Sequence, residues 1–256
     1  MAGSGVSAVT AASGRADSFS LRYLEIGRAG AVERRGPLAA CWSTRFEDAP
    51  PVRQFPSHKG QKNFPGLYYA GCSGRHVGFE SWLERDHLMM LDYSPRVRSF
   101  AAQPFWLSWP SGGRMRRHAP DFFVRLVDGG GVVIDVRPDD RIEPHDAEAF
   151  AVTATACESV GWGYRRVGVL DAVLVANVRW LAGYQHARCL RDQHRGALEE
   201  AFAAPRPLLE GVETVGDRLA VLPSLFHLMW SQVLTADLES SPLTGASMVQ
   251  APKGGR

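Results

Sequence analysis

Hydrophobic residues recur along this chain with two different periods, and each period predicts a different kind of element. Short apolar runs of strand length predict β-strands over 20–28, 36–46, 97–104, 105–109 and 164–169. Apolar positions three and four residues apart predict helices over 78–93, 146–160 and 171–184. Asp171 stands where the last helix needs an N-cap residue, and Gly161 stands where the second helix needs a C-terminal glycine. Strands and helices in this order predict an α/β domain with a mixed sheet flanked by helices.

The clearest local pattern lies between Ala119 and Pro138. Two apolar, β-branched runs flank the sequence Asp-Gly-Gly-Gly at 128–131, which predicts a β-hairpin. Each run carries an aspartate near the open end of the hairpin, Asp121 on one strand and Asp135 on the other. Because side chains alternate along a strand, Asp135 and Arg137 are expected on one face.

Two carboxylates and a cation at one strand end suit a divalent metal ion bound beside a phosphoryl group. Their spacing is that of the PD-(D/E)xK nuclease signature, with Arg137 standing where lysine is expected. Such sites take a third carboxylate from a helix before the sheet, and Glu84 is the natural candidate, with Glu80 one turn earlier. The expected ion is Mg²⁺, with Mn²⁺ as the alternative.

The same residues also fit purely structural roles. An aspartate at a strand end commonly forms a turn, and Glu84, taken alone, is typical of a solvent-exposed helix residue. Arginine keeps its proton in proteins, so Arg137 can bind a phosphate but cannot act as a base.

A basic run precedes the hairpin and supplies candidate DNA contacts. It consists of Arg114, Arg116, Arg117 and His118. These side chains suit contact with a phosphate backbone, and a solvated strand edge is the alternative. The tryptophans at 106, 109, 162 and 180 are expected to pack in the core or on the sheet rather than to stack on bases.

Composition narrows the class of protein. The formal charge of the 256 residues is +2, and lysine occurs only at Lys59, Lys62 and Lys253, so arginine dominates the 29 basic residues. The four cysteines are widely spaced, which argues against a zinc site or a disulfide framework. With no apolar run of membrane-spanning length and no signal peptide pattern, we expect a cytoplasmic protein that does not contact membranes.

The C-terminal quarter has a different character. Helices are expected over 197–202, 208–215 and 222–234, and a small hairpin over 241–249, which together predict a winged-helix-like module or a plain helical cap. The expected division of the chain is a disordered tail at 1–18, a β-rich and loop segment at 19–77, an endonuclease domain at 78–190, the helical module at 196–249 and a tail at 250–256.

Six collinear motifs between Gly78 and Tyr184 resemble those of the TnsA transposon-end endonucleases. They are Ser81-Trp82-Leu83-Glu84-Arg85, Gln103-Pro104, Pro120-Asp121-Phe122-Phe123-Val124, Ile134-Asp135-Val136-Arg137-Pro138, Gly161-Trp162-Gly163-Tyr164 and Asn177-Val178-Arg179-Trp180-Leu181. The resemblance implies a restriction-endonuclease-like fold in which Glu84, Asp121 and Asp135 bind the metal. Arg137 then occupies the lysine position, and Asp135 stands where family members carry Glu or Gln.

The resemblance also implies a biological setting. Family members nick one strand at each transposon end, a DDE-type transposase subunit joins the other strand, and an AAA+ ATPase regulates both. The C-terminal module of the family faces such partners. Our leading hypothesis is therefore a Mg²⁺-dependent DNA endonuclease subunit of a TnsA/TnsB-type transposase. The alternatives are a catalytically impaired DNA-binding or assembly subunit on the same fold, and a stand-alone repair or restriction nuclease.

Overall fold

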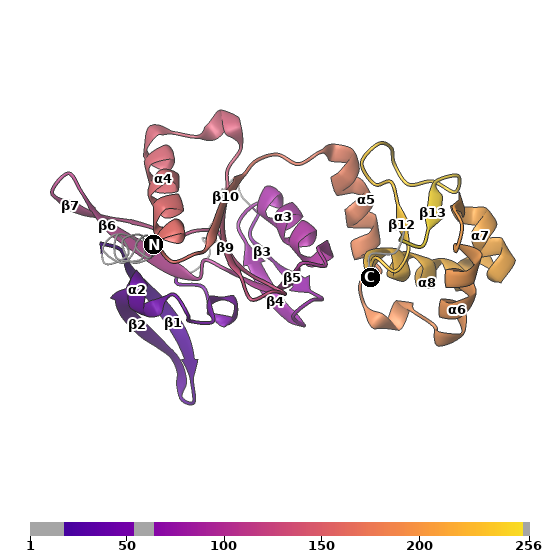
Figure 1. Ribbon diagram of the computed structural model, residues 1–256, viewed down its shortest axis with the longest axis horizontal. Coiled ribbons are helices and arrows are strands. Elements are labelled where there is room, and N and C mark those ends of the chain that lie inside the picture. The colour runs from indigo at the N-terminus through magenta and orange to yellow at the C-terminus, as the bar shows by residue number, and fades with distance from the viewer. Residues whose placement is uncertain (1–17, 54–63, 253–256) are drawn as a thin grey trace, which may run out of the picture. The chain divides into compact units, whose positions relative to one another are not determined.

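The chain forms a mixed α/β structure with several sheets. The computed structural model describes residues 18–53 and 64–252 (Figure 1). Contacts divide these residues into two compact units. The first takes in the described residues up to Arg85 together with Arg96–Val169, and the second takes in Asp86–Pro95 and the described residues from Leu170 onward. The segment at 19–77 therefore belongs to the same compact unit as the predicted hairpin. Residues 1–17, 54–63 and 253–256, with most of the predicted tails and all three lysines, lie outside the described residues.

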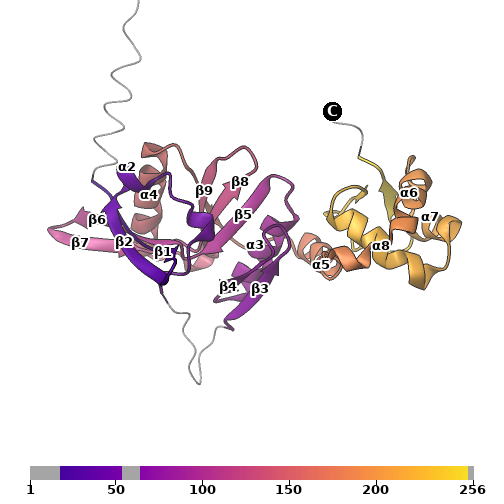
Figure 2. The ribbon, with the colours of Figure 1, turned by 90° about the horizontal axis from the view of Figure 1, so that it is seen from below.

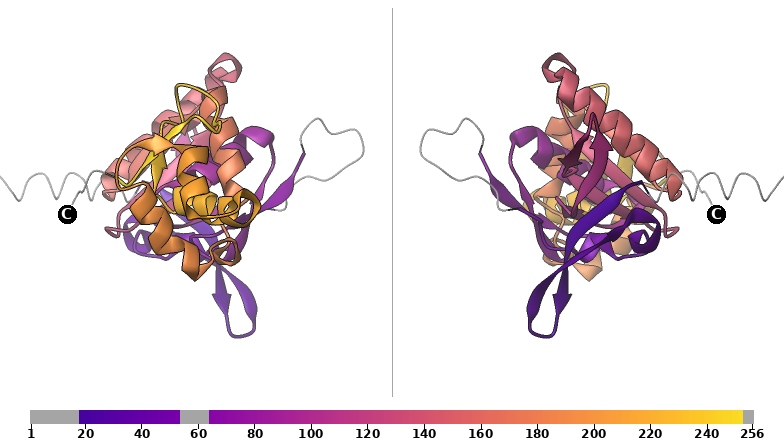
Figure 3. Two further views of the ribbon diagram at one scale, coloured as in Figure 1. Left: turned by 90° about the vertical axis from the view of Figure 1, so that its right-hand side faces the viewer. Right: turned by 90° about the vertical axis from the view of Figure 1, so that its left-hand side faces the viewer.

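An antiparallel sheet in the first unit has the order β2-β1-β6-β7. Its strands are β1 (Ser20–Gly27), β2 (Gly30–Pro37), β6 (Phe105–Ser111) and β7 (Arg114–His118). The first four residues of β1 pair with β6, whereas β2 pairs with β1 along its whole length. The β1–β2 hairpin therefore extends beyond the other strands of its sheet, as Figures 1 and 3 show. Figure 2 shows the paired strands β6 and β7 of the same sheet from below.

The prediction of a strand over residues 36–46 is wrong. That stretch ends β2 and then forms the short helix α2 (Leu38–Cys41) and the 3₁₀ turn η1 (Phe46–Asp48). The strand lies earlier, over the charged residues of β2, nearly all of them exposed. Cross-strand ion pairs such as Arg34 to Glu25 at 2.9 Å join it to β1. Because β2 is exposed on both faces, its sequence lacks the alternation that marks a half-buried strand.

The second sheet contains the predicted hairpin. Its order is β10-β9-β8-β5, and its strands are β5 (Val97–Ala102), β8 (Phe122–Leu126), β9 (Gly131–Val136) and β10 (Gly163–Val167). Strands β8 and β9 pair antiparallel through the predicted glycine turn, where Gly129 has a φ of 91°. Helix α4 (Pro144–Ser159) connects β9 to β10, which pair in parallel, so the predicted mixed sheet is confirmed.

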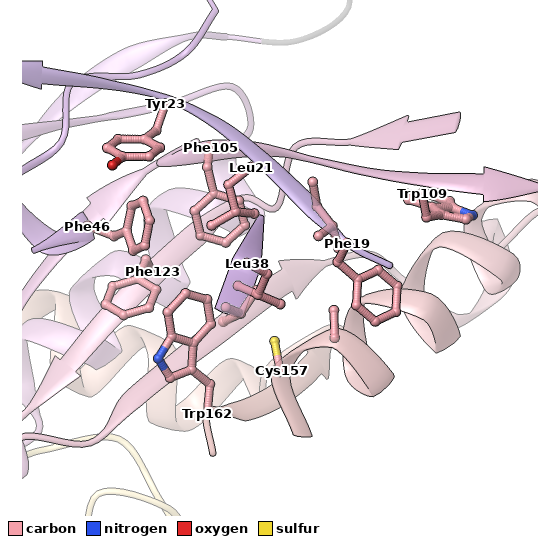
Figure 4. Packing of buried hydrophobic residues seen from close by; sticks show 13 residues of the cluster. Phe19, Leu21, Tyr23, Leu38, Phe46, Phe105, Trp109, Phe123, Cys157 and Trp162 are labelled. Carbon is pink, nitrogen blue, oxygen red and sulfur yellow. The ribbon is translucent and has the colours of Figure 1, made fainter. Parts of the chain in front are cut away.

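Aromatic rings fill the core between the two sheets and α4 (Figure 4). Phe46 is fully buried, and its ring lies 4.9–5.6 Å from the rings of Tyr23, Phe105, Phe123 and Trp162. All four contacts are edge-to-face, the geometry that aromatic pairs prefer. Phe46 thus joins the turn η1 to β-strands from both sheets.

The helix predicted over 78–93 begins later than expected. Residues Arg75–Phe79 form strand β4, which pairs with β3 (Gly66–Ala70), and helix α3 runs over Trp82–Tyr93. Ser81 Oγ accepts the N–H of Glu84 at 3.1 Å and starts the helix there. Gly78 and Phe79 are paired in the strand, so they cannot belong to the helix.

The second unit is mainly helical. It contains α5 (Ala172–Ala182), η3 (Ala187–Cys189), α6 (Asp192–Ala201), α7 (Leu208–Val215) and α8 (Arg218–Trp230). Asp171 caps α5 as predicted, since its Oδ1 accepts the N–H groups of Val173 and Leu174 at 2.9 Å. Trp180, for which packing in the core or on the sheet is predicted, is instead 55% exposed on this helix.

A three-stranded sheet completes the second unit, with the order β11-β13-β12. Its strands are β11 (Arg206–Pro207), β12 (Thr235–Ala236) and β13 (Met248–Gln250). The hairpin predicted over 241–249 is therefore wrong, because the strands that pair lie at the two ends of a longer loop. Asn177 secures this loop: its side chain bonds the backbone of Leu238, Ser241 and Leu243 at 2.8–2.9 Å.

Two general expectations can be compared with the structure. All four cysteines are free thiols in the structure. No helix in the described part of the chain combines the length and the apolar character needed to cross a membrane.

Candidate active site

The two aspartates of the hairpin lie opposite each other. Phe122 pairs with Ile134 across the hairpin, and continuing this antiparallel register by one residue places Asp121 opposite Asp135. Backbone groups fix Asp121 on both sides: the N–H of Val136 donates to its Oδ2 at 2.7 Å, and the N–H of Gln103 donates to its carbonyl oxygen at 2.8 Å. The predicted convergence of the two carboxylates is therefore present.

Asp135 is nearly inaccessible to solvent, with 1% of its surface exposed. Its Oδ1 lies 2.8 Å from His118 Nε2, and its Oδ2 accepts the hydroxyl of Tyr164 at 2.9 Å. Burial and the Asp135 carboxylate raise the pKa of Tyr164, so this hydroxyl stays protonated and keeps donating. The same two causes raise the pKa of the neighbouring Cys157 thiol to about 12.

Glu84 lies in the first turn of α3, where its carboxylate also accepts hydrogen bonds at the N-terminus of the helix. Its Oε1 accepts the hydroxyl of Ser81 at 3.0 Å, and its Oε2 accepts the N–H of Glu80 at 2.8 Å. With Ser81 accepting from the Glu84 backbone, this is a variant of the capping box, in which a serine and a glutamate three residues later satisfy each other's helix end. Burial raises the pKa of the Glu84 carboxyl above its ordinary value.

The negative charges of neighbouring acids act on the carboxyl group of Asp121. The pKa of Asp121 is raised well above its ordinary value of 3.8, first by burial and then by the negative charges of Asp135, Glu84 and Glu80. Acids that repel in this way offer hard oxygen ligands, the kind that Mg²⁺ and Mn²⁺ prefer. Within the described residues, however, no three His, Cys, Asp or Glu side chains have the spacing of a formed metal site. The donors suit a hard cation in kind, and binding one requires the carboxylates to close further.

Arg137 is tied to the helix that follows its strand. Its Nη2 donates to Oδ1 of Asp146 at 3.0 Å, and its side chain is 43% exposed. Asp146 also accepts the N–H of Glu143 in the capping box of α4. The guanidinium in the lysine position is therefore held by an acid that belongs to the helix start.

One hollow of about 770 Å³ joins these groups. All four predicted catalytic residues, Glu84, Asp121, Asp135 and Arg137, line it. Glu80 lines it too, and Arg53 binds Glu80 through two contacts of 2.7 and 2.8 Å. No sequence pattern predicts this contact of Arg53, because no motif or repeat includes that residue.

The predicted basic run divides between the faces of β7. Strand alternation places Arg114, Arg116 and His118 on one face and Arg117 on the other. Arg116 lies 3.7 Å from Glu148 of α4, and His118 contacts Asp135. Arg116, Arg117 and His118 line the hollow, whereas Arg114 is not among its lining residues. Sequence reasoning therefore missed the role of His118, whose contact with Asp135 follows from the register of two different sheets.

The chain was compared with known proteins by sequence, and neither a protein-family model nor a curated protein matches it.

Proposed function

We propose that this protein is a Mg²⁺-dependent DNA endonuclease with a restriction-endonuclease-like first unit. One observation carries the proposal: Asp121 and Asp135 lie opposite each other at the open end of a hairpin and share a hollow with Glu84 and Arg137. Like-charged carboxylates placed together destabilise a fold unless a proton or a cation joins them, so their convergence supports a cation as ligand. The order β10-β9-β8-β5 around this hairpin supports the assignment.

Each residue has a role that its position supports. Asp121, Asp135 and Glu84 would hold Mg²⁺, which supplies an activated water and neutralises charge on the phosphate when bound. His118 and Tyr164 orient the Asp135 carboxylate through hydrogen bonds, as outer residues commonly do around metal ligands. Arg137 lies on the hollow with part of its side chain exposed and can bind the scissile phosphate.

The second unit supports a place in a TnsA-like transposase. Its order of elements, α6-β11-α7-α8-β12-β13, and its sheet order β11-β13-β12 support the proposal of a winged-helix-like module. Helix α8 is largely buried along its length, and Arg218 at its start is ion-paired with Glu213. Such a helix is poorly suited to enter a DNA groove, so we infer that this unit binds protein partners, namely the DDE-type transposase and an AAA+ ATPase.

A supercoiled plasmid tests the nuclease directly. In Mg²⁺ or Mn²⁺, the wild type should convert it to the nicked form, and Asp121→Ala should lower the rate at least about a hundredfold. Asp140→Ala removes an exposed aspartate from the same unit and is the matched control. Unchanged nicking by Asp121→Ala would reject the proposal.

Two observations favour the second candidate, an impaired nuclease kept for DNA binding or assembly. Arg137 is already paired with Asp146, and both oxygens of Asp135 are already hydrogen-bonded. Arg137→Lys separates the candidates: nicking that appears only in this variant indicates an impaired site, whereas nicking that is similar in the wild type shows that arginine suffices there.

A further inference from the structure

Trp106 occupies a central place on the outward face of the β2-β1-β6-β7 sheet. Strand β6 lies between β1 and β7, and Trp106 pairs directly with Arg22 of β1. The guanidinium carbon of Arg22 lies 5.9 Å from the centroid of the indole ring, and that of Arg117 of β7 lies 4.5 Å from it. Two arginines thus approach one tryptophan from the strands on its two sides.

The outward face of this sheet, which carries Trp106, does not belong to the hydrophobic core. The alternate residues of the same strands point the other way and are buried, among them Leu21, Phe105, Leu107 and Trp109. Arg117 is exposed, and no carboxylate among the described residues pairs with it. Arg22 shares Glu33 with Arg35, at 3.3 and 2.6 Å. This face therefore carries three arginines, Arg22, Arg35 and Arg117, and one acid, Glu33, so its positive charges are in excess.

The two guanidinium groups decide what this face can bind. An indole that stacks on a nucleobase must present an open face, but here the guanidinium groups of Arg22 and Arg117 already lie over the ring. Stacking on an aromatic ring instead holds a guanidinium in one plane, with its N–H groups directed outward. A preordered guanidinium suits a phosphate oxygen, because less side-chain freedom is lost on binding.

We propose that Arg22 and Arg117, ordered by Trp106, form a clamp for DNA backbone phosphates beside the carboxylates. Trp106 and Arg117 line the same hollow as Asp121 and Asp135, so a strand bound by the clamp reaches that hollow. The inference rests on the proposed function, since it takes DNA as the substrate. It deepens that function by assigning contact with the strand to this sheet face and by assigning Trp106 a positioning role.

Fluorescence anisotropy of a labelled mixed-sequence DNA duplex tests the clamp in EDTA, where neither metal binding nor cleavage contributes. Arg117→Ala should weaken binding about tenfold, the value of one charge-assisted hydrogen bond. It should also reduce the slope of log K against log salt by about 0.9, the release of one counterion. Arg98→Ala, which removes an exposed arginine from β5 of the other sheet, should change neither quantity as much.

A second pair of variants separates ordering from charge. Trp106→Leu and Arg117→Lys keep the positive charges but lose the stacked guanidinium, so affinity should fall while the salt slope stays unchanged. Thermal unfolding of each variant identifies those that fail to fold. If Trp106→Leu fails to fold, Arg117→Lys still tests the clamp, because its substitution lies at an exposed position.

The outcomes distinguish the clamp from the nuclease. If the wild type binds the duplex and Arg117→Ala behaves like Arg98→Ala, the clamp is refuted and the proposed function stands. If the wild type binds through Arg117 but never nicks plasmid, the clamp stands and only cleavage is lost. A wild type that does not bind duplex DNA overturns both.

Discussion

The like-charge carboxylates make a prediction about stability that does not require any catalysis. Asp121→Asn keeps the shape of the side chain and leaves an oxygen to accept the N–H of Val136. It removes a charge that burial and the Asp135, Glu84 and Glu80 carboxylates disfavour. Near neutral pH and without metal, the variant should therefore be more stable than the wild type. We expect a gain of about 1–3 kcal/mol, the usual cost of leaving a buried polar group poorly compensated.

The direction of the pKa shift fixes how this difference depends on pH. The pKa of Asp121 is raised in the folded state, so the folded wild type binds its proton more tightly than the unfolded chain does. Below the ordinary value of 3.8 the side chain is protonated in both states, and the variant should have no advantage. The wild type should lose stability relative to Asp121→Asn as pH rises from there through the raised pKa, and the difference should then stay constant.

Urea unfolding followed by circular dichroism measures this difference, in EDTA and in excess Mn²⁺. An ion that binds only the folded protein adds about 2.7 kcal/mol at a hundredfold excess over its Kd, so Mn²⁺ should stabilise the wild type and reduce or reverse the gap. Asp140→Asn, at an exposed position, should match the wild type in both buffers. A wild type that is more stable than Asp121→Asn in EDTA at neutral pH would contradict the proposed repulsion.

Three further substitutions test the packing and capping that hold the two units. Phe46→Ala should destabilise the protein by about 3–5 kcal/mol in urea unfolding, because it empties the centre of four ring contacts; a loss under 1 kcal/mol would refute that role. Asn177→Ala should cost about 1–3 kcal/mol and speed hydrogen exchange at Leu243, whereas unchanged exchange there would show that the loop holds itself. Asp171→Ala should cost about 1 kcal/mol through loss of the α5 cap, and Asp171→Asn, which keeps an acceptor, should cost less.

The hairpin and its acids were predictable because local signals agree there. Turn glycines, β-branched runs and the two-residue period all indicate one register, and that register alone places Asp121 opposite Asp135. Helices α4 and α5 were predictable for the same reason, since Gly161 and Asp171 mark their ends. Where local propensity, spacing and end signals coincide, the structure follows the sequence closely.

Other features depend on contacts between distant segments, and the sequence alone does not contain them. His118 lies beside Asp135 because the end of β7 and the end of β9 meet, although they belong to different sheets. Arg53 likewise forms an ion pair with Glu80 because the fold brings together two segments that are 27 residues apart. Strand β2 was missed because an edge strand exposed on both faces has no buried side to mark its period. Phe46 was assigned to a strand because a single buried aromatic residue fits a turn and a strand equally well.

The site itself bears on the choice between an active and an impaired nuclease. Glu84 satisfies the start of α3, and a capping role alone would account for it. Hydrogen bonds account for where Asp121 and Asp135 lie. They do not account for both residues being acids, since two carboxylates directly opposite each other lower stability unless a proton or a cation joins them. Asparagine in place of Asp121 would keep the hydrogen bond from the N–H of Val136 and remove the repulsion. A scaffold for DNA binding or assembly gains nothing from this cost, whereas a metal site requires it, so the presence of both acids in this chain supports the proposal of chemistry that depends on a cation.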